Sequence, residues 1–145
     1  MKTVTIRAAI PADTPAMEQV AIAAYAEARA RIADLPDVTG GLGADIAQNH
    51  VWVGKIDGKL VGFAVLVLTA NSAKLANIAV HPNSGGAGIG RALINQVEAA
   101  TIAAGLRELS LVTHRDMPEN VALYTRLGWN EVDRRGAGVV MRKTL

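Results

Sequence analysis

The chain has 145 residues, the usual length of one domain, and we treat 1–145 as a single domain. Half of the residues are apolar and 19% are charged, which favours a packed core and excludes a disordered chain. There is no cysteine, so disulfides, thiolate metal sites and a cysteine nucleophile are excluded. The net charge is +2 and the basic residues are scattered, so we expect no nucleic-acid binding.

The sequence shows no segment typical of membrane insertion. Residues Met1 to Arg7 lack the apolar stretch of a signal peptide. The longest apolar run, Leu60–Leu68, is far shorter than the ~20 residues that span a bilayer. We therefore expect a cytoplasmic protein that does not bind membranes.

The first elements are a strand and a long helix. Val4–Ala8 alternates weakly and predicts a strand. Thr14 is expected as an N-cap, with Pro15 at the first helical position. Apolar residues then recur at helical spacing, which predicts a helix from about Pro15 to Ile32.

A loop follows from Asp34 to Gly43, with one proline and three glycines. The sequence leaves open whether a short helix forms near Ala44–Gln48, at the end of this loop.

A hairpin signal occupies the middle of the chain. His50–Ile56 and Lys59–Leu68 flank Asp57-Gly58, which suits a two-residue type I′ turn. The second of these strands is apolar on both faces, which is typical of a central strand. A further strand, Ala73–Val80, ends at His81-Pro82, because proline cannot continue a ladder.

The second half alternates helices and strands. The expected elements are a helix from Ile89 to Ala104 capped by Gly105, a strand at Leu109–Thr113, a helix at Pro118–Leu127, and a final strand pair at Trp129–Arg134 and Val139–Arg142. The fold class is therefore α/β, with a mixed, largely antiparallel sheet of six to seven strands and three to four flanking helices.

A glycine-rich segment, Gly85 to Arg91, lies between a strand end and a helix start. Glycines there let backbone N–H groups converge on an anion at the helix N-terminus, although a flexible connection has the same composition. Two known nucleotide-binding loop motifs do not match this sequence. G-x-G-x-x-G lacks its last glycine at Arg91 or Leu93, and the P-loop pattern lacks its lysine and hydroxyl at Arg91-Ala92.

The segments Ile78–Pro82 and Gly86–Leu93 resemble the strand, pyrophosphate loop and helix of the GNAT superfamily of N-acetyltransferases. Gly88 and Gly90 match the family signature, whereas Gly85 stands at its Arg/Gln position. Pro118–Trp129 is similar to the later Leu-Tyr and Leu-Gly-aromatic element of the family. The order of elements also agrees, so the resemblance covers essentially the whole chain.

The resemblance implies direct transfer of an acetyl group from acetyl-CoA to a primary amine, without a metal. Tyr124 would donate a proton to the departing thiolate, as a phenol can over a short distance. The other implied cofactor-binding residues are Ile78, Ala79 and Val80, which would pair with the pantetheine arm, and Gly85, Gly86, Ala87, Gly88, Ile89, Gly90 and Arg91, which would hold the pyrophosphate.

Asn120 is expected beside Tyr124 on one helical face and is a further candidate for the pantetheine arm, or a surface amide. The family often has an Asn where Met117 stands and a Glu where Ala76 stands. His114, and Asn77 acting through water, remain as candidates for the general base.

Two functions follow. The first is an N-acetyltransferase whose acceptor is a small-molecule amine or a peptide N-terminus. Because binding residues are often carried on irregular loops, we expect the loop from Asp34 to Gly43 on the acceptor side of the site, ordering when the acceptor binds. The alternative is a catalytically weak acyl-CoA-binding regulatory module, which the replacements at Gly85, Ala76 and Met117 favour and Tyr124 opposes. A homodimer is left open.

Overall fold

The structure is a computed structural model that describes residues 3–35 and 39–145. One seven-stranded sheet has the order β1-β2-β3-β4-β5-β7-β6, with β4 and β5 parallel and all other neighbours antiparallel. The strands are β1 (Val4–Ala8), β2 (His50–Ile56), β3 (Lys59–Leu68), β4 (Ala73–Val80), β5 (Glu108–His114), β6 (Asn130–Arg135) and β7 (Gly138–Thr144). The helices are α1 (Thr14–Arg31), α2 (Leu42–Gln48), α3 (Ile89–Ala103) and α4 (Pro118–Arg126), with short 3-10 helices η1 (Pro11–Asp13) and η2 (Pro82–Ser84). The predicted order and fold class are confirmed.

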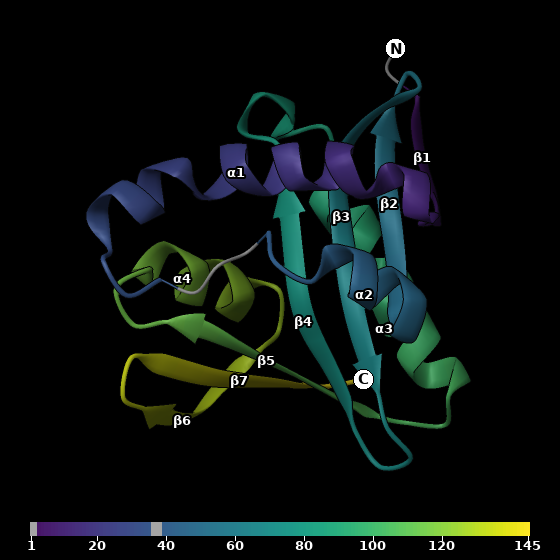
Figure 1. The fold of residues 1–145 in the computed structure, drawn as a ribbon. Coiled ribbons are helices and arrows are strands. Elements are labelled where there is room, and N and C mark those ends of the chain that lie inside the picture. The colour runs from purple at the N-terminus through teal and green to yellow at the C-terminus, as the bar shows by residue number, and fades with distance from the viewer. Residues whose placement is uncertain (1–2, 36–38) are drawn as a thin grey trace.

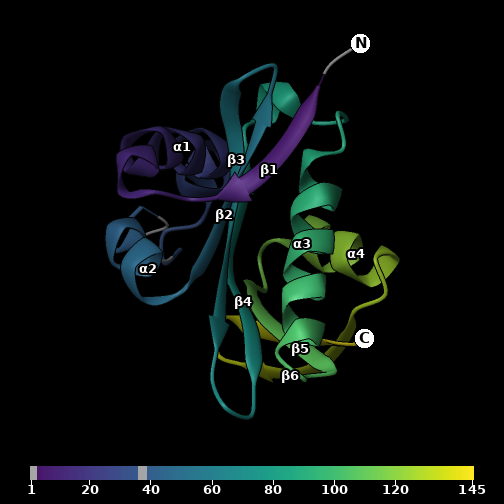
Figure 2. The ribbon, with the colours of Figure 1, turned by 90° about the vertical axis from the view of Figure 1, so that its right-hand side faces the viewer.

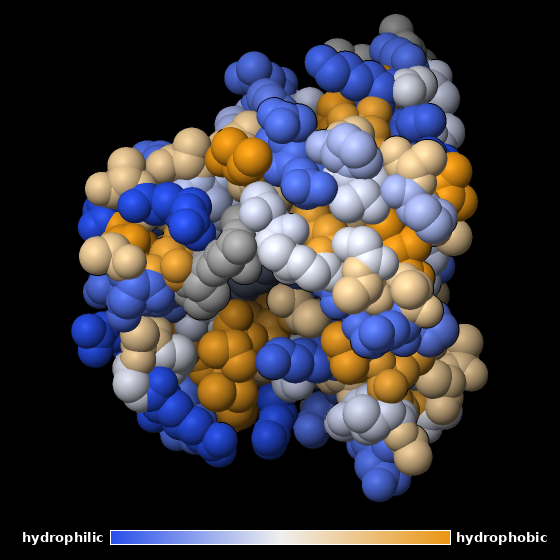
Figure 3. Space-filling model, in the orientation of Figure 1, coloured by the Kyte–Doolittle hydropathy of each residue, from blue (hydrophilic) through white to orange (hydrophobic). Residues whose placement is uncertain are grey.

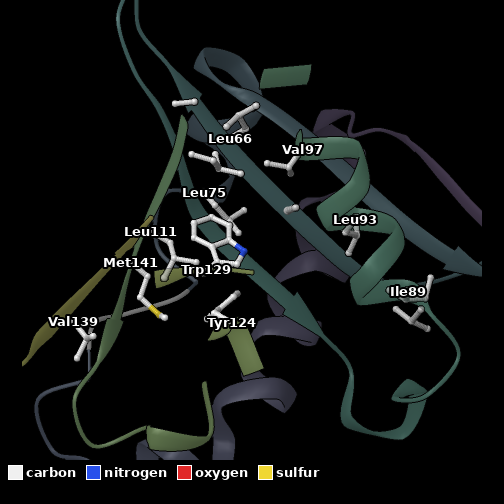
Figure 4. Packing of buried hydrophobic residues seen from close by; sticks show 14 of the residues in the cluster. Leu66, Leu75, Ile89, Leu93, Val97, Leu111, Tyr124, Trp129, Val139 and Met141 are labelled. Atoms are coloured by element: carbon white, nitrogen blue, oxygen red, sulfur yellow. The ribbon is translucent and has the colours of Figure 1, made fainter. Parts of the chain in front are cut away.

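The sheet is covered on both faces, with α1 and α2 on one side and α3 and α4 on the other (Figures 1 and 2). On the α3 side, Trp129 lies among Leu75, Leu111 and Met141, with Tyr124 beside it (Figure 4). Phe63 and its neighbours pack on the α1 side. Within the described ranges, no helix has the length and apolar character needed to cross a membrane.

The hairpin turn has the predicted geometry, because Asp57 and Gly58 have φ of 49° and 85°. The predicted N-cap at Thr14 is wrong. Thr14 is already helical, and its Oγ1 donates to the Pro11 carbonyl, 2.9 Å away. The extra turn η1 shifts the cap to Asp13, whose carboxylate binds Arg7 instead.

Two glycines let α3 approach the sheet closely. Gly54 and Gly62 are register partners on β2 and β3. A Cβ at Gly62 would lie 2.9 Å from Ile89 Cγ2 and 3.1 Å from the Ala79 carbonyl oxygen. The start of α3, and with it the glycine loop, is therefore seated directly on the sheet.

The two halves of the sheet separate between β4 and β5. Val65 pairs with Asn77 and Leu66 with Leu75, so Ala76 is the extra residue of a β-bulge. The described residues of β4 and β5 share one register pair, Lys74 with Ser110. Beyond it the strands diverge, as Figure 1 shows, and the later part of β4 has an edge with no strand partner in the described part of the chain.

Replacing Gly62 by alanine should destabilise the fold by about 1–3 kcal/mol, because the added methyl group overpacks the contact with Ile89. Gly43→Ala is the matched control. Gly43 lies inside α2 with open space at its Cβ position, so this change should stabilise by roughly 0.5–1 kcal/mol. Urea unfolding measures both. Equal stability of the two variants would contradict the close approach.

Candidate active site

A cavity of about 310 Å³ lies where β4 and β5 diverge. The end of α1, the α4 helix and the turn before β7 complete its wall. Its lining is largely apolar and includes Tyr25, Leu35, Leu111, Met117 and Tyr124. On the face that Figure 3 shows, hydrophobic surface gathers over β5 and β7, and the half-exposed Val112 of β5 belongs to the cavity wall.

The edge of β4 presents backbone groups toward this gap. His81 N–H donates to the Val61 carbonyl at 2.7 Å, so His81 faces β3. Because antiparallel strands alternate, Ala79 also faces β3, while Ile78 and Val80 turn their N–H and C=O outward. The Tyr25 hydroxyl donates to the Ile78 carbonyl at 3.2 Å.

Tyr124 is buried at the cavity and packs edge-to-face on Trp129, with ring centroids 5.8 Å apart. Burial, and secondly the nearby Tyr25, raise the pKa of Tyr124 above the usual value for a phenol. The hydroxyl therefore stays protonated over the working pH range of most enzymes. A buried, protonated phenol in a cavity can donate a hydrogen bond to a bound group.

His114 ends β5 with its ring buried in the cavity wall. Its Nε2 lies 2.9 Å from Asp34 Oδ1, and its Nδ1 accepts from the Asp116 N–H at 3.0 Å. Both ring nitrogens thus have partners, and His114 could take a proton only if one of these bonds opened. Asp34 is a further polar group of the site that sequence reasoning did not single out.

Asn77 and Asn120 line the same cavity from β4 and α4. Asn120 Nδ2 donates to Thr113 Oγ1 at 3.3 Å and lies 3.8 Å from Met117 Sδ. Met117 is buried where the resembled family often has an amide. Asn120, which lies in α4 three residues after Met117, therefore brings an amide into the cavity that Met117 cannot provide.

The glycine loop lies at the end of β4, beyond the cavity lining. Gly86 and Gly88 both have φ of 85°, and a Cβ at either would meet no atom within 4 Å. These glycines serve the backbone conformation and leave open space above it. Gly85 has φ of −62°, which any residue adopts.

Gly88 caps α3, and its carbonyl accepts the Ala92 N–H at 3.0 Å. The N–H groups of Ile89, Gly90 and Arg91 therefore belong to the first turn, where a helix has no acceptors of its own. Free N–H groups, the helix dipole and open space fit a bound pyrophosphate. Ala87 is partly buried and packs against the core, which anchors the glycine loop to the sheet side of the molecule.

A second hollow of about 380 Å³ lies between α3 and α4. Arg91 and Arg126 line it, together with Lys143, which pairs with Glu98 at 2.9 Å. The positive charge of this hollow favours a polyanion at the start of α3. Within residues 3–35 and 39–145, no cluster of three or more metal-ligating side chains is found.

Comparison with known proteins identifies the family. The family model for the acetyltransferase (GNAT) domain matches residues 47–131, which is more than half of the chain. The chain belongs to the GNAT acetyltransferase family. It is 34% identical to the mycothiol acetyltransferase of Frankia casuarinae over 65% of this chain and 26% of that one. It is also 34% identical to the ribosomal protein bS18-alanine N-acetyltransferase of Escherichia coli K12 over 54% of this chain and 53% of that one. The matches thus span about half or less of these relatives.

Solved structures share the GNAT fold over nearly the whole chain. The PaiA N-acetyltransferase of Thermoplasma acidophilum, in complex with coenzyme A, superposes with a TM-score of 0.88 at 21% identity, over 99% of both chains. The ribosomal-protein-S18-alanine N-acetyltransferase of Escherichia coli gives 0.82 at 24% identity, over 98% of this chain and 94% of that one.

Within this GNAT fold, the predicted site residues fall into two groups, apart from Ala79. The backbone N–H and C=O of Ala79 face β3 and, contrary to the expectation, are not open to the pantetheine arm. Asn77, Ile78, His114, Asn120 and Tyr124 line the cavity. The residues from Val80 to Arg91 lie along the end of β4, the glycine loop and the start of α3. The expected acceptor loop is described in part, since residues 36–38 lie outside the described ranges, and its Asp34 and Leu35 line the cavity.

Gly88→Val should weaken coenzyme A binding by roughly tenfold or more, because a β-branched residue at φ of 85° costs about 1–3 kcal/mol and distorts the loop. Gly105→Val is the matched control. Gly105 has φ of 82° and open space at its Cβ position, but it lies at the other end of α3. Titration calorimetry with coenzyme A should find the control close to the parent. Equal affinities of both variants would remove the loop from the binding site.

Proposed function

We propose that the chain is an N-acetyltransferase that moves an acetyl group from acetyl-CoA to a primary amine of a small molecule or peptide N-terminus. The observation that carries the proposal is the edge of β4 past Lys74, which has no strand partner among the described residues. This edge connects a glycine loop at one end with a cavity containing Tyr124 at the other. Family membership and the fold shared with a coenzyme A complex support this proposal.

The donor would be held mainly by backbone groups. Its pyrophosphate belongs on the N–H groups from Gly86 to Arg91, with Arg91 and Arg126 adding positive charge nearby. Its pantetheine amides belong on the outward groups of Ile78 and Val80. The amide of Asn120 supplements them from α4. This route leads the thioester into the cavity.

The chemistry requires attack on the thioester carbonyl and departure of a thiolate. Tyr124 is the proposed proton donor to the sulfur. The raised pKa of Tyr124 weakens it as an acid, but burial in the same cavity raises the pKa of the leaving thiol as well. Burial therefore shifts the pKa of both groups in the same direction, and the phenol hydrogen bond stabilises the developing negative charge.

The acceptor is proposed to be an α-amine or another amine of low pKa. The relatives include an enzyme named for acetylating an alanine of a ribosomal protein and one named for mycothiol. The attacking species must be the neutral amine. Among the described residues that line the cavity, His114 has both nitrogens engaged and Asp34 is the one carboxylate.

The same scarcity of bases, with Ala76 at the bulge, favours a second candidate, a weak acyl-CoA-binding regulatory module. Release of free thiol from acetyl-CoA, measured across a panel of amines, separates the two. An enzyme releases thiol in proportion to amine, whereas a binding module shows affinity without turnover.

Tyr124→Phe should lower kcat by about 10²- to 10⁴-fold, because the lost proton donor acts on the leaving thiolate. Coenzyme A affinity should change little. Tyr25→Phe removes the other cavity phenol, whose hydroxyl binds a backbone carbonyl, and should lower kcat far less. Steady-state kinetics with a fixed amine makes the comparison. A Tyr124→Phe rate within about twofold of the parent would assign Tyr124 to packing alone.

Low-pKa amines should be preferred near pH 7. Deprotonating an amine of pKa near 10.4 costs about 4.6 kcal/mol at pH 7, against about 1.1 kcal/mol for an α-amine of pKa near 7.8. The kcat/KM of matched amines of graded pKa should converge as pH rises toward the higher pKa values. Equal use of high-pKa and low-pKa amines at pH 7 would show that an efficient base acts before attack.

A further inference from the structure

Asp34 is the one acidic side chain among the described residues that line the main cavity. Its side chain is 62% exposed, whereas the His114 side chain that it contacts is 6% exposed. Glu27 and Asp45, two other carboxylates of the same half of the chain, bind Arg31 and Asn49 and do not line the cavity. Asp34 therefore combines a fixed inner contact with an open outer face at the cavity mouth.

The hydrogen bonds of His114 define which atom carries its proton. Nδ1 accepts the Asp116 N–H at 3.0 Å, so it has no proton of its own in the neutral ring. The proton is then on Nε2, which donates to Asp34 Oδ1 at 2.9 Å. A carboxylate can accept several hydrogen bonds, so Asp34 keeps accepting capacity for a further donor.

The nearby cation Arg31 binds groups other than the Asp34 carboxylate, which leaves that carboxylate able to bind a ligand. Arg31 donates to the Asp116 carbonyl at 2.7 Å and pairs with Glu27 and Glu119 at 3.2 and 3.3 Å. No lysine or arginine in residues 3–35 and 39–145 forms an ion pair with Asp34. Arg31 thus ties the end of α1 to the turn before α4 without neutralising the carboxylate.

We propose that Asp34 is the acceptor-binding residue of this site, that its carboxylate binds the ammonium or amine of the acceptor, and that it takes the proton released during transfer. His114 is a positioning residue that holds the carboxylate at the cavity mouth. This inference rests on the proposed acetyltransferase function and adds the group that recognises the acceptor.

The proton balance is complete with these groups. The ammonium loses one proton to solvent, and the neutral amine then attacks the thioester carbonyl. A C–N bond forms and the C–S bond breaks, while the sulfur takes the proton of Tyr124. The second proton of the nitrogen passes to Asp34. Because Asp34 is exposed, solvent can carry this proton away and restore the proton on Tyr124.

Asp34→Asn tests the proposal, since asparagine keeps the oxygen that accepts from His114 but removes the charge. Asp116→Asn is the matched control, because Asp116 carries the same charge beside His114 but does not line the cavity. The probes are a tripeptide amide that begins with alanine, and the same peptide with lactate in place of alanine. The lactate peptide offers a hydroxyl where the first has an ammonium. Both are titrated into the protein saturated with coenzyme A, and acetyl transfer to the alanine peptide is measured in parallel.

The parent should bind the alanine peptide roughly 10- to 100-fold more tightly than the lactate peptide, as expected for a hydrogen bond to a charged group. Asp34→Asn should abolish this preference and lower kcat/KM for the alanine peptide by a similar factor. Its coenzyme A affinity should equal that of the parent, which also verifies folding. Asp116→Asn should keep the preference.

His114→Phe should reduce the preference, and adding it to Asp34→Asn should cause little further loss, since both act through one carboxylate. A preference that survives in Asp34→Asn, or that the parent lacks, would overturn the assignment. Absence of coenzyme A binding or of transfer to any amine in the parent would instead overturn the proposed function.

Discussion

Past Lys74 and Ser110, the described residues of β4 and β5 share no further register pair, and the candidate site occupies the gap that results. A strand edge inside a protein must find partners for its N–H and C=O groups. On β4 the bulge at Ala76 determines which residues turn their backbone N–H and C=O groups toward the gap. These residues are Ile78 and Val80. A ligand with amide groups can pair with the outward backbone groups of this edge.

The hydrophobic core packs directly beside this gap. Trp129 and Tyr124 pack against each other below it, and Leu75 and Leu111 join them from β4 and β5 (Figure 4). The Trp129 Nε1 has no hydrogen-bond partner within the described part of the chain. Its apolar contacts therefore have to outweigh the cost of burying this N–H. The same packing buries the Tyr124 ring and raises its pKa.

Local signals predicted most of the fold. The hairpin at Asp57-Gly58, the strand Ala73–Val80 and the helix after Gly88 each depend on residues close in sequence, and their bounds agree with the structure. The N-cap at Thr14 was wrong because Arg7, from a separate strand, binds the Asp13 carboxylate and an extra turn precedes the helix. Such a competing contact between elements leaves no local pattern.

The candidate site divides in the same way. The glycine loop and Tyr124 lie in recognisable motifs, so the sequence indicated them. His114 was a candidate from the sequence, but Asp34 lies 80 residues away and no local pattern pairs the two. Their contact exists because Arg31 ties the end of α1 to the Asp116 carbonyl and β5 ends beneath it. Predicting it required the three-dimensional arrangement of both elements.

This division has a physical basis. A loop that binds an anion through backbone N–H groups depends on φ, which glycine at positions 86 and 88 makes accessible, and hence on residue type. Gly85 has an ordinary backbone conformation and contributes no left-handed turn to this loop. The proposed acceptor recognition depends instead on side chains that separate elements bring together. Under that proposal, one GNAT framework keeps its donor segment while the end of α1 and the end of β5 change, and with them the amine that the site selects.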